Sequence, residues 1–534
     1  MITATENHCS VRVNGMDRRL LCFAVFSMCM AACPAVHAAA QALPSSQVAW
    51  LQAAGDGDIE RAFAQARTER KPLLLYWGAK WCPPCNQLKA TLFNRQDFIE
   101  RSRSFVAVSI DGDLPGAQAL GARFKVIGYP TMILFTPAGA EITRLPGEAD
   151  APQVMRVLQL GLTGGRPVKA VLADARSGRA LPANDWRMLA FYSWETDEQQ
   201  LVAESGRSQL LASLAAASRS GDPEIATRLW LKALAANEDG KGVKPDAALH
   251  ERVRGVLGSV AATRLHMDVL TNGAATIVKT LAPRAGPSRG ALLASFDAAL
   301  TRLQADRTLS RADRLGALLA RVDLARLDQP KDAPRPKLPP ALLEDVREHA
   351  RRADREITDG YERQAVITTA AHVLGRAGLW QESDGLLKGN LAKSHSPYYL
   401  MSQLAGNART RGDKAEALRW YAEAFNASEG PATRLQWGAS YLAALVDLTP
   451  KDAKRIEQTA SQIFRNAAAQ PNPFHQRSAR SLRRVGEKLA SWSERGVHGD
   501  VIKRLQSELE PVCARLATAD GQRAACEGLL KPAA

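Results

Sequence analysis

Hydrophobic positions between residues 45 and 165 alternate between the spacing of helices and the spacing of buried strands. Ala62, Phe63 and Ala66 recur at helical spacing within residues 59–69, and the run from Pro72 to Trp77 is almost continuously apolar, as in a strand buried on both faces. The same pattern predicts further helices from about residue 83, at 118–124 and at 151–160, and further strands at 105–110, 131–135 and 141–144. This order of elements predicts an α/β domain over residues 45–165.

The pattern changes after Gly164 and Gly165. Amphipathic stretches rich in Ala, Leu and Arg follow, with hardly any strand signal, so everything beyond about residue 185 is predicted to be all-helical. A proline-rich segment at 329–340 interrupts the helices and divides them into regions 185–330 and 341–534. A length of 534 residues predicts about three or four folded units, since a domain holds about 150 residues.

Small residues recur at a spacing of 34 in the C-terminal region. They are Ala371 with Gly378, Ala405 with Gly412, and then Ala439. Thirty-four residues is the tetratricopeptide period, in which small residues let two helices cross closely. Val446 stands where the third glycine would recur. The pattern favours degenerate TPR-like helical repeats over 341–534, and an irregular helical bundle is the alternative.

Residues 1–40 have the pattern of a secretory signal peptide. Basic residues precede a short apolar run from Leu20 to Ala32, and small residues follow it, with cleavage expected after Ala38 or Ala40. Met16 is an alternative start. A lipoprotein acylated at Cys33 is a second alternative, and a short buried helix is a third. The pattern predicts export to the periplasm, and no later tract is apolar for the ~20 residues that a membrane span requires.

The net charge of +15 is spread along the chain. Basic residues alternate with acidic ones in segments such as 344–348 and 351–356, without a block of like charge. Such a pattern is typical of solvated helix faces, and export separates the protein from genomic DNA. We therefore expect no nucleic-acid partner.

Four of the eight cysteines remain after removal of residues 1–40. They form two pairs, Cys82 with Cys85 and Cys513 with Cys526. An even number in an oxidising compartment favours disulfides over free thiols. The second pair flanks a turn between two helical stretches, where a structural disulfide is expected; a second redox pair relaying electrons to Cys82 is the alternative.

Trp81-Cys82-Pro83-Pro84-Cys85 lies where a buried strand passes into a helix. There the unsatisfied N–H groups and the helix dipole favour an anion, so Cys82 is expected to ionise readily and act as the nucleophile. Cys85, one turn later, can resolve a mixed disulfide by closing a ring with Cys82. Pro83 and Pro84 suit the first helical turn.

Two neighbours complete this expected site. Lys80 adds positive charge near the thiolate. Trp81 is expected either to offer a flat apolar surface to partners or to pack as an ordinary surface aromatic.

A second motif, Gly128-Tyr129-Pro130-Thr131, precedes the strand at 131–135. Together the two motifs resemble the thioredoxin superfamily, and the segment from Ala66 to Cys85 is similar to the thioredoxin-like C-terminal domain of transmembrane thiol:disulfide interchange proteins and to related exported thioredoxins. The resemblance covers about residues 50–163. It implies that Pro130 is cis and faces the disulfide, and that Tyr129 influences the choice of substrate.

One residue departs from the family's pattern. Many thioredoxins have a buried aspartate six positions before the first cysteine, which helps to deprotonate the resolving cysteine, and here that position is Tyr76. Deprotonation of the resolving cysteine, Cys85, is therefore expected to differ from that in the family. Asp111 is a candidate substitute, although a turn residue at the end of a strand is the favoured interpretation of it.

These features predict a thioredoxin fold followed by a large all-α region. A lone C-x-x-C is half of a zinc or copper site, but the seven remaining histidines show no ligand spacing, so we expect no metal and no cofactor. The predicted function is periplasmic thiol:disulfide exchange with protein thiols and a redox partner protein. The alternative is a helical-repeat scaffold that binds proteins through a thioredoxin domain without turnover. Neither the direction of electron flow nor the oligomeric state follows from these patterns.

Overall fold

The computed structural model describes residues 47–218, 222–238, 240, 242–330, 333–494, 497–519 and 521–531. The expected signal peptide, Met16 and Cys33 lie outside the described residues. Within these ranges, none of the helices combines the length and the apolar character needed to cross a bilayer.

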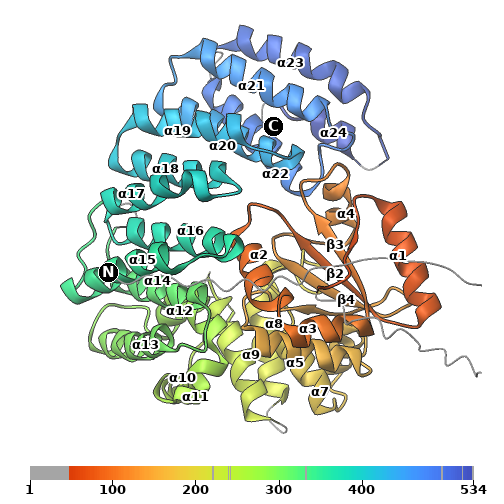
Figure 1. Cartoon of the computed structure of the whole chain (residues 1–534), viewed down its shortest axis with the longest axis vertical. Coiled ribbons are helices and arrows are strands. Elements are labelled where there is room, and N and C mark those ends of the chain that lie inside the picture. The colour runs from red at the N-terminus through yellow and green to blue at the C-terminus, as the bar shows by residue number, and fades with distance from the viewer. Residues whose placement is uncertain are drawn as a thin grey trace, which may run out of the picture. The chain divides into compact units, whose positions relative to one another are not determined.

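A five-stranded mixed sheet forms the N-terminal part of the described chain (Figure 1), in the order β1-β3-β2-β4-β5. The strands are β1 (Leu51–Gln52), β2 (Leu73–Gly78), β3 (Val106–Asp111), β4 (Thr131–Phe135) and β5 (Glu141–Leu145). Central β2 runs parallel to β3 and antiparallel to β4, and all six of its residues are buried. The hydrophobic pattern predicts β2 to β5, and for β2 and β4 the reason is that burial on both faces produces nearly continuous apolar runs. It missed β1, which has two residues, both exposed.

Alternate residues of the strands enter two different cores. Leu73, Leu75 and Trp77 join one core with α1 (Asp56–Glu69) and α4 (Ala117–Arg123). Leu74 and Tyr76 face the other core, whose members come from the remaining elements of the domain: α2 (Pro83–Leu88), the π-helical turn η1 (Lys89–Phe93), α3 (Gln96–Arg101) and α5 (Ala151–Leu162). This second core continues through buried residues of the following helices as far as Leu324, so one face of the sheet is stabilised by the helical region.

Every regular element described after residue 165 is a helix, as the amphipathic stretches predict. The first helices are α6 (Val168–Arg176), α7 (Ala183–Phe191), α8 (Arg207–Ala217), α9 (Pro223–Ala235), α10 (Ala247–Gly258), α11 (Val260–Leu265), α12 (Met267–Leu281), α13 (Pro287–Ala305), α14 (Arg311–Ala325) and α15 (Pro340–Glu356). The later ones are α16 (Gly360–Arg376), α17 (Trp380–Asn390), α18 (Pro397–Arg411), α19 (Lys414–Ala427), α20 (Pro431–Leu448), α21 (Ala453–Ala468), α22 (Gln476–Trp492), α23 (Gly499–Ala514) and α24 (Gln522–Glu527).

Local sequence accounts for several helix starts. Asp359, Asp413 and Asp452 cap α16, α19 and α21, each accepting a hydrogen bond from a backbone N–H in the first turn. Consecutive helices from α16 to α20 pack against one another along the chain.

The two recurring glycines follow helix ends. Gly378 comes just after α16 with φ of 78°, and Gly412 caps α18 with φ of 84°, a conformation that glycine adopts without steric cost. Val446 lies inside α20, which continues to Leu448, so no turn occurs there. The TPR-like repeat stays a prediction.

Candidate redox site

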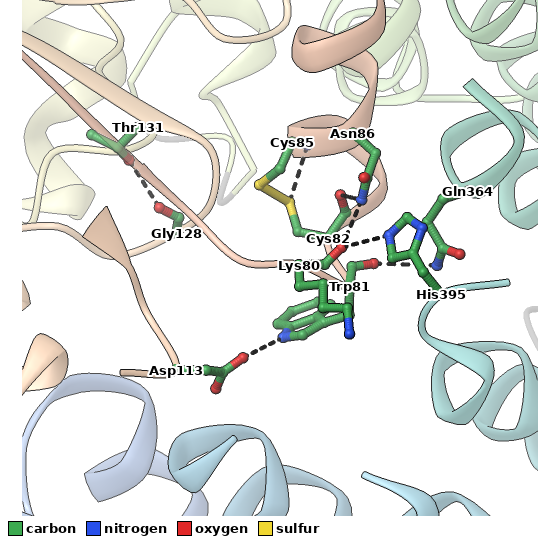
Figure 2. Close-up of a disulfide and its surroundings, with 10 residues drawn as sticks. All are labelled: Lys80, Trp81, Cys82, Cys85, Asn86, Asp113, Gly128, Thr131, Gln364 and His395. Atoms are coloured by element: carbon green, nitrogen blue, oxygen red, sulfur yellow. Dashed lines mark hydrogen bonds between the residues drawn. A yellow bond between two sulfur atoms is a disulfide. The ribbon is translucent and has the colours of Figure 1, made fainter. Parts of the chain in front are cut away.

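Cys82 and Cys85 are joined by a disulfide at the junction of β2 and α2 (Figure 2). Cys82 is the N-cap of α2, and its Sγ accepts a hydrogen bond of 3.2 Å from the backbone N–H of Cys85. Pro83 and Pro84 occupy the first two helical positions, where a missing N–H costs no hydrogen bond. The same N–H that contacts the sulfur in the disulfide is available to stabilise a Cys82 thiolate.

Asn86 fixes the turn before this helix, and no sequence signal singled it out. Its Nδ2 donates to the carbonyl of Lys80 at 2.9 Å and to that of Cys82 at 2.8 Å, and the residue is fully buried. The bonds hold the backbone on both sides of Trp81, so the position of the cysteine pair does not depend on the disulfide alone.

The loop opposite the disulfide contains the second motif. The Tyr129–Pro130 peptide bond is cis, and Thr131 Oγ1 donates to the carbonyl of Gly128 at 2.8 Å. Gln118 Nε2 donates to the Tyr129 hydroxyl at 2.9 Å, which orients its ring. The loop therefore has a defined conformation beside Cys82.

Arg144 of β5 anchors the segment leading into this loop. Its guanidinium is completely buried and donates to the carbonyls of Phe124, Lys125 and Thr196 at 2.6 to 3.0 Å, with Glu141 as its ion-pair partner at 2.9 Å. The sequence alone could not single out Arg144 for this role, because the three carbonyls that it binds belong to segments far away in sequence.

The disulfide is buried beneath the helical region. Cys82 is 2% exposed and Cys85 is 0% exposed. Helix α16 packs on α2, and α22 packs on α4. Figure 2 shows Gln364 and His395 approaching the turn: Gln364 Nε2 donates to the Trp81 carbonyl at 3.5 Å, and His395 Nε2 contacts the Lys80 carbonyl at 3.0 Å.

Trp81 is covered by the helical region instead of offering a flat surface to solvent. Its ring stacks on Tyr399 with centroids 5.7 Å apart, and it meets Trp437 edge to face at 6.3 Å. The guanidinium of Arg477 lies over the Trp81 ring, 5.1 Å from the ring centroid, and forms a cation–π contact with it. Helices α18, α20 and α22 thus each contribute one side chain to the cover of Trp81.

Asp113 ties this cover to the thioredoxin-like domain. It accepts from Trp81 Nε1 at 3.0 Å, from the backbone N–H of Thr433 at 2.9 Å, from the Thr433 hydroxyl at 2.7 Å, and from the Arg477 guanidinium. The Asp113 and Arg477 side chains are only 13% and 10% exposed. Because the pair is shielded from water and the two Nη atoms of Arg477 also donate to Gln436 and Thr433, it belongs to the class of ion pairs whose disruption is strongly destabilising.

Lys80 is paired with a carboxylate, which competes with the Cys82 sulfur for its positive charge. Its ammonium forms a salt bridge of 3.1 Å with Glu429, and both side chains are more than half exposed. An exposed pair of this kind contributes little to stability. The Lys80 carbonyl is the more constrained part, since Asn86 and His395 both contact it.

Tyr76 fills the position of the family's aspartate with an aromatic ring. It packs edge to face on Phe93 at 4.9 Å, and within the described part of the chain its hydroxyl has no hydrogen-bond partner. Burial and the nearby Asp111 carboxylate raise the pKa of Tyr76 well above its usual value, so it remains protonated. Asp111 ends β3 and accepts from the Asp113 N–H at 3.0 Å, as a turn residue does.

Two cavities adjoin each other at the cis-proline loop, and the smaller one reaches the disulfide. The smaller, of about 310 Å³, is lined by Cys82, Trp81, Tyr399, Arg477 and Arg480 among others. The larger, of about 800 Å³, is bordered by Pro130 and Gly147 and extends into the helical region. Their linings share three residues: Pro84, Gly128 and Tyr129. The loop that contains the cis peptide bond therefore borders both cavities.

Glu148 contributes an exposed carboxylate to the lining of the larger cavity. Asn272 Nδ2 donates to Glu148 Oε2 at 2.8 Å.

Cys513 and Cys526 form a disulfide between α23 and α24, with Cα atoms 5.4 Å apart. Both cysteines belong to the core of the C-terminal helices, and neither lines the cavities at Cys82. Within the described ranges, no three His, Cys, Asp or Glu side chains gather in a way that would hold a metal ion.

Comparison with known proteins agrees with this geometry. Residues 59–161 match the family model for a thioredoxin-like domain. Thiol:disulfide interchange protein DsbD 1 of Pseudomonas aeruginosa is 28% identical over 134 residues, which are 24% of this chain and 22% of the relative. DsbD of Cronobacter sakazakii is 32% identical over 121 residues, 22% of this chain and 21% of the relative. The chain thus spans about a fifth of the length of these interchange proteins.

Two further matches differ in what they establish. A circular tandem repeat protein of known structure aligns with 68% of this chain and 78% of its own at 15% identity, but its TM-score of 0.16 is too low to indicate a shared fold. A thioredoxin of Mycolicibacterium smegmatis is 32% identical over 88 residues, which are 16% of this chain and 76% of that protein. Through this domain, the chain belongs to the thioredoxin family.

Proposed function

We propose that the protein is an exported thiol:disulfide oxidoreductase that exchanges disulfides with protein substrates at Cys82 and Cys85. The observation that carries the proposal is the cysteine pair itself: Cys82 is the N-cap of α2 with a backbone N–H on its sulfur, beside a cis-proline loop. The similarity to interchange proteins and to a thioredoxin supports the same chemistry. Export to the periplasm is supported by the signal-like pattern of residues 1–40.

The proposed exchange proceeds in two steps. The Cys82 thiolate of the reduced protein attacks one sulfur of a substrate disulfide, forms a mixed disulfide, and the other substrate sulfur leaves as a thiolate. The Cys85 thiolate then attacks Cys82 Sγ, restores the Cys82–Cys85 disulfide, and releases the second substrate thiolate. Two electrons pass from the protein to the substrate, and a dithiol donor must return them. Oxidation of a substrate dithiol is the same sequence in reverse.

Tyr76 shapes the second step. Since Tyr76 stays protonated, it does not accept the Cys85 proton in the way that a carboxylate would. Solvent that reaches the cavities at Cys82 is the proposed acceptor, so resolution is expected to accelerate with pH as Cys85 ionises.

Insulin reduction with dithiothreitol as the electron donor tests the function. We expect turnover by the full-length protein, loss of turnover in Cys82→Ser, and accumulation of a trapped mixed disulfide in Cys85→Ser. Activity that is the same in Cys82→Ser as in the unsubstituted protein would eliminate the enzyme and leave the scaffold alternative. The reduction potential of the pair then decides direction: a value near about −270 mV indicates a reductase, and one near about −120 mV an oxidant.

A further inference from the structure

The helices that cover the redox site leave only a small space at its sulfur. Cys82 is 2% exposed, and the rings of Tyr399 and Trp437 lie against Trp81 beside it. The cavity that Cys82 lines has a volume of about 310 Å³, at the lower end of the range of ligand sites. A folded partner, in contrast, needs about 800 Å² of complementary surface. With the cover in place, the space at the sulfur therefore suits a small molecule.

The charges in the lining of this small cavity have one sign. Among the described residues, its charged members are Arg477 and Arg480 of α22, and no carboxylate lines it. Arg477 is neutralised by Asp113, which lies outside the lining, and its guanidinium lies over the rings of Trp81 and Tyr129. The second arginine therefore determines the net charge that a ligand in the cavity meets.

Arg480 has only neutral hydrogen-bond partners. Its Nη1 donates to the side-chain oxygen of Gln476 at 3.1 Å, and its Nη2 donates to the Ile127 carbonyl at 3.2 Å. Glu198 attracts Arg480 electrostatically, but its Oε2 accepts from Gln476 Nε2 at 2.7 Å, and the two form no ion pair in the described part of the chain. A guanidinium has five N–H groups, so donors remain for a ligand. An anionic ligand group would supply the missing counter-charge through charge-assisted hydrogen bonds, which are the strong ones.

The other walls of the cavity are mostly apolar. The rings of Trp81, Tyr129 and Tyr399 line it, together with the prolines that follow Cys82. Aromatic and aliphatic walls with a small number of polar groups are typical of sites for small ligands. The cavity thus combines a redox-active sulfur, walls that suit methylene groups, and one guanidinium without a counter-ion.

We propose, building on the exchange reaction above, that this cavity takes a second class of substrate, a low-molecular-weight disulfide that bears carboxylate groups. A carboxylate of the ligand binds Arg480 while the Cys82 thiolate attacks a ligand sulfur. The sulfur–sulfur bond of the ligand breaks, a mixed disulfide with Cys82 forms, and one small thiolate leaves. The Cys85 thiolate then attacks Cys82 Sγ and releases the second small thiolate, so two electrons pass from the protein to the ligand. The helical region thereby supplies the charge that selects this substrate.

Three small disulfides of similar length test this assignment. Dithiodipropionate is an anion at neutral pH, hydroxyethyl disulfide is neutral, and cystamine is a cation. The full-length Cys85→Ser protein, in its reduced form, is mixed with each compound, and mass spectrometry with peptide mapping follows the adduct on Cys82. Each rate constant is divided by that of the same disulfide with mercaptoethanol, which corrects for intrinsic reactivity.

Normalised rates are expected to fall from dithiodipropionate to hydroxyethyl disulfide to cystamine. We expect about a tenfold ratio between the first and the last, at the low end of what a charged cleft contributes to association rates. Arg480→Gln keeps a side-chain donor for the Ile127 carbonyl but removes the charge, so it is expected to bring the three rates together. Arg480→Lys retains the charge and is expected to retain the preference. Arg484→Gln is the matched control, because this exposed arginine lies one turn further along α22 and lines neither cavity, and it is expected to leave the preference unchanged.

The outcomes separate this assignment from the exchange function. Insulin reduction that requires Cys82, combined with equal normalised rates for the three disulfides or with no adduct on Cys82, keeps the function and overturns the small substrate. A preference that Arg484→Gln lowers as much as Arg480→Gln overturns it as well, and so does a complete loss of preference in Arg480→Lys. Insulin reduction at the same rate in Cys82→Ser overturns the exchange function, whereas a charge-dependent adduct on Cys82 would still establish the binding site.

Discussion

Asp113→Asn is expected to loosen the helical region from the redox site. In the structure Oδ2 accepts from Trp81 Nε1 while Oδ1 accepts from Thr433 and from the Arg477 guanidinium. Asparagine keeps only one of these two acceptor oxygens, so its side-chain NH2 faces the indole N–H of Trp81 and two donors oppose each other. Arg477 also loses its counter-charge. Since both side chains of the ion pair are nearly buried, we expect a loss of about 3–5 kcal/mol in the free energy that holds the cover in place.

That loss predicts a measurable exposure of Cys82. At the lower value, an opening equilibrium rises by about 10²-fold, since 1.36 kcal/mol corresponds to a factor of ten. Reaction of Cys82 in the reduced protein with a large polymer-linked maleimide reports the opening, and iodoacetamide, which is small, corrects for thiol reactivity. Urea unfolding measures the stability of the same variant.

Asp97→Asn is the matched control. It breaks an exposed ion pair, in which the Asp97 side chain is 51% exposed and the Arg95 side chain 41% exposed. We therefore expect the free energy of unfolding to change by less than about 1 kcal/mol. Unchanged maleimide labelling together with unchanged stability in Asp113→Asn would refute the claim that this carboxylate holds the cover. Equal effects of the two substitutions would refute it as well.

Three further outcomes are expected. Replacing Cys513 and Cys526 by serine lowers the stability of the C-terminal helices by about 3 kcal/mol in thermal or urea unfolding, because the disulfide closes a loop of 13 residues, and leaves Cys82-dependent exchange intact. Tyr76→Phe removes a buried hydroxyl that has no partner in the described chain, so stability changes by less than about 1 kcal/mol and the exchange rate is retained; a large fall in rate would assign the hydroxyl a role in proton transfer. Burial lowers the pKa of His266 from 6.5 to about 4, so the unfolded chain binds a proton there that the folded chain does not; stability present above pH 6.5 is lost as the pH falls towards 4, and His266→Gln flattens the urea-unfolding profile in that window.

The sequence by itself determined the elements that depend on neighbours along the chain. The strand at 131–135 has the predicted bounds, because a strand buried on both faces needs an unbroken apolar run. The cysteine pair at the start of a helix could be located in the same way, since N-capping and the two prolines act within one turn. The helical character of the chain beyond residue 185 likewise follows from local periodicity.

Only the tertiary structure decided what surrounds the disulfide. Asp113 meets Thr433 and Arg477 across separations of 320 and 364 residues, and Trp81 meets Tyr399 across a similar distance in sequence. On a helix sequence, residues such as Tyr399 and Arg477 look like ordinary members of an amphipathic pattern, yet the Arg477 side chain is buried. Which helix faces meet is set by packing between distant segments, and the local spacing of residues contains no information about it.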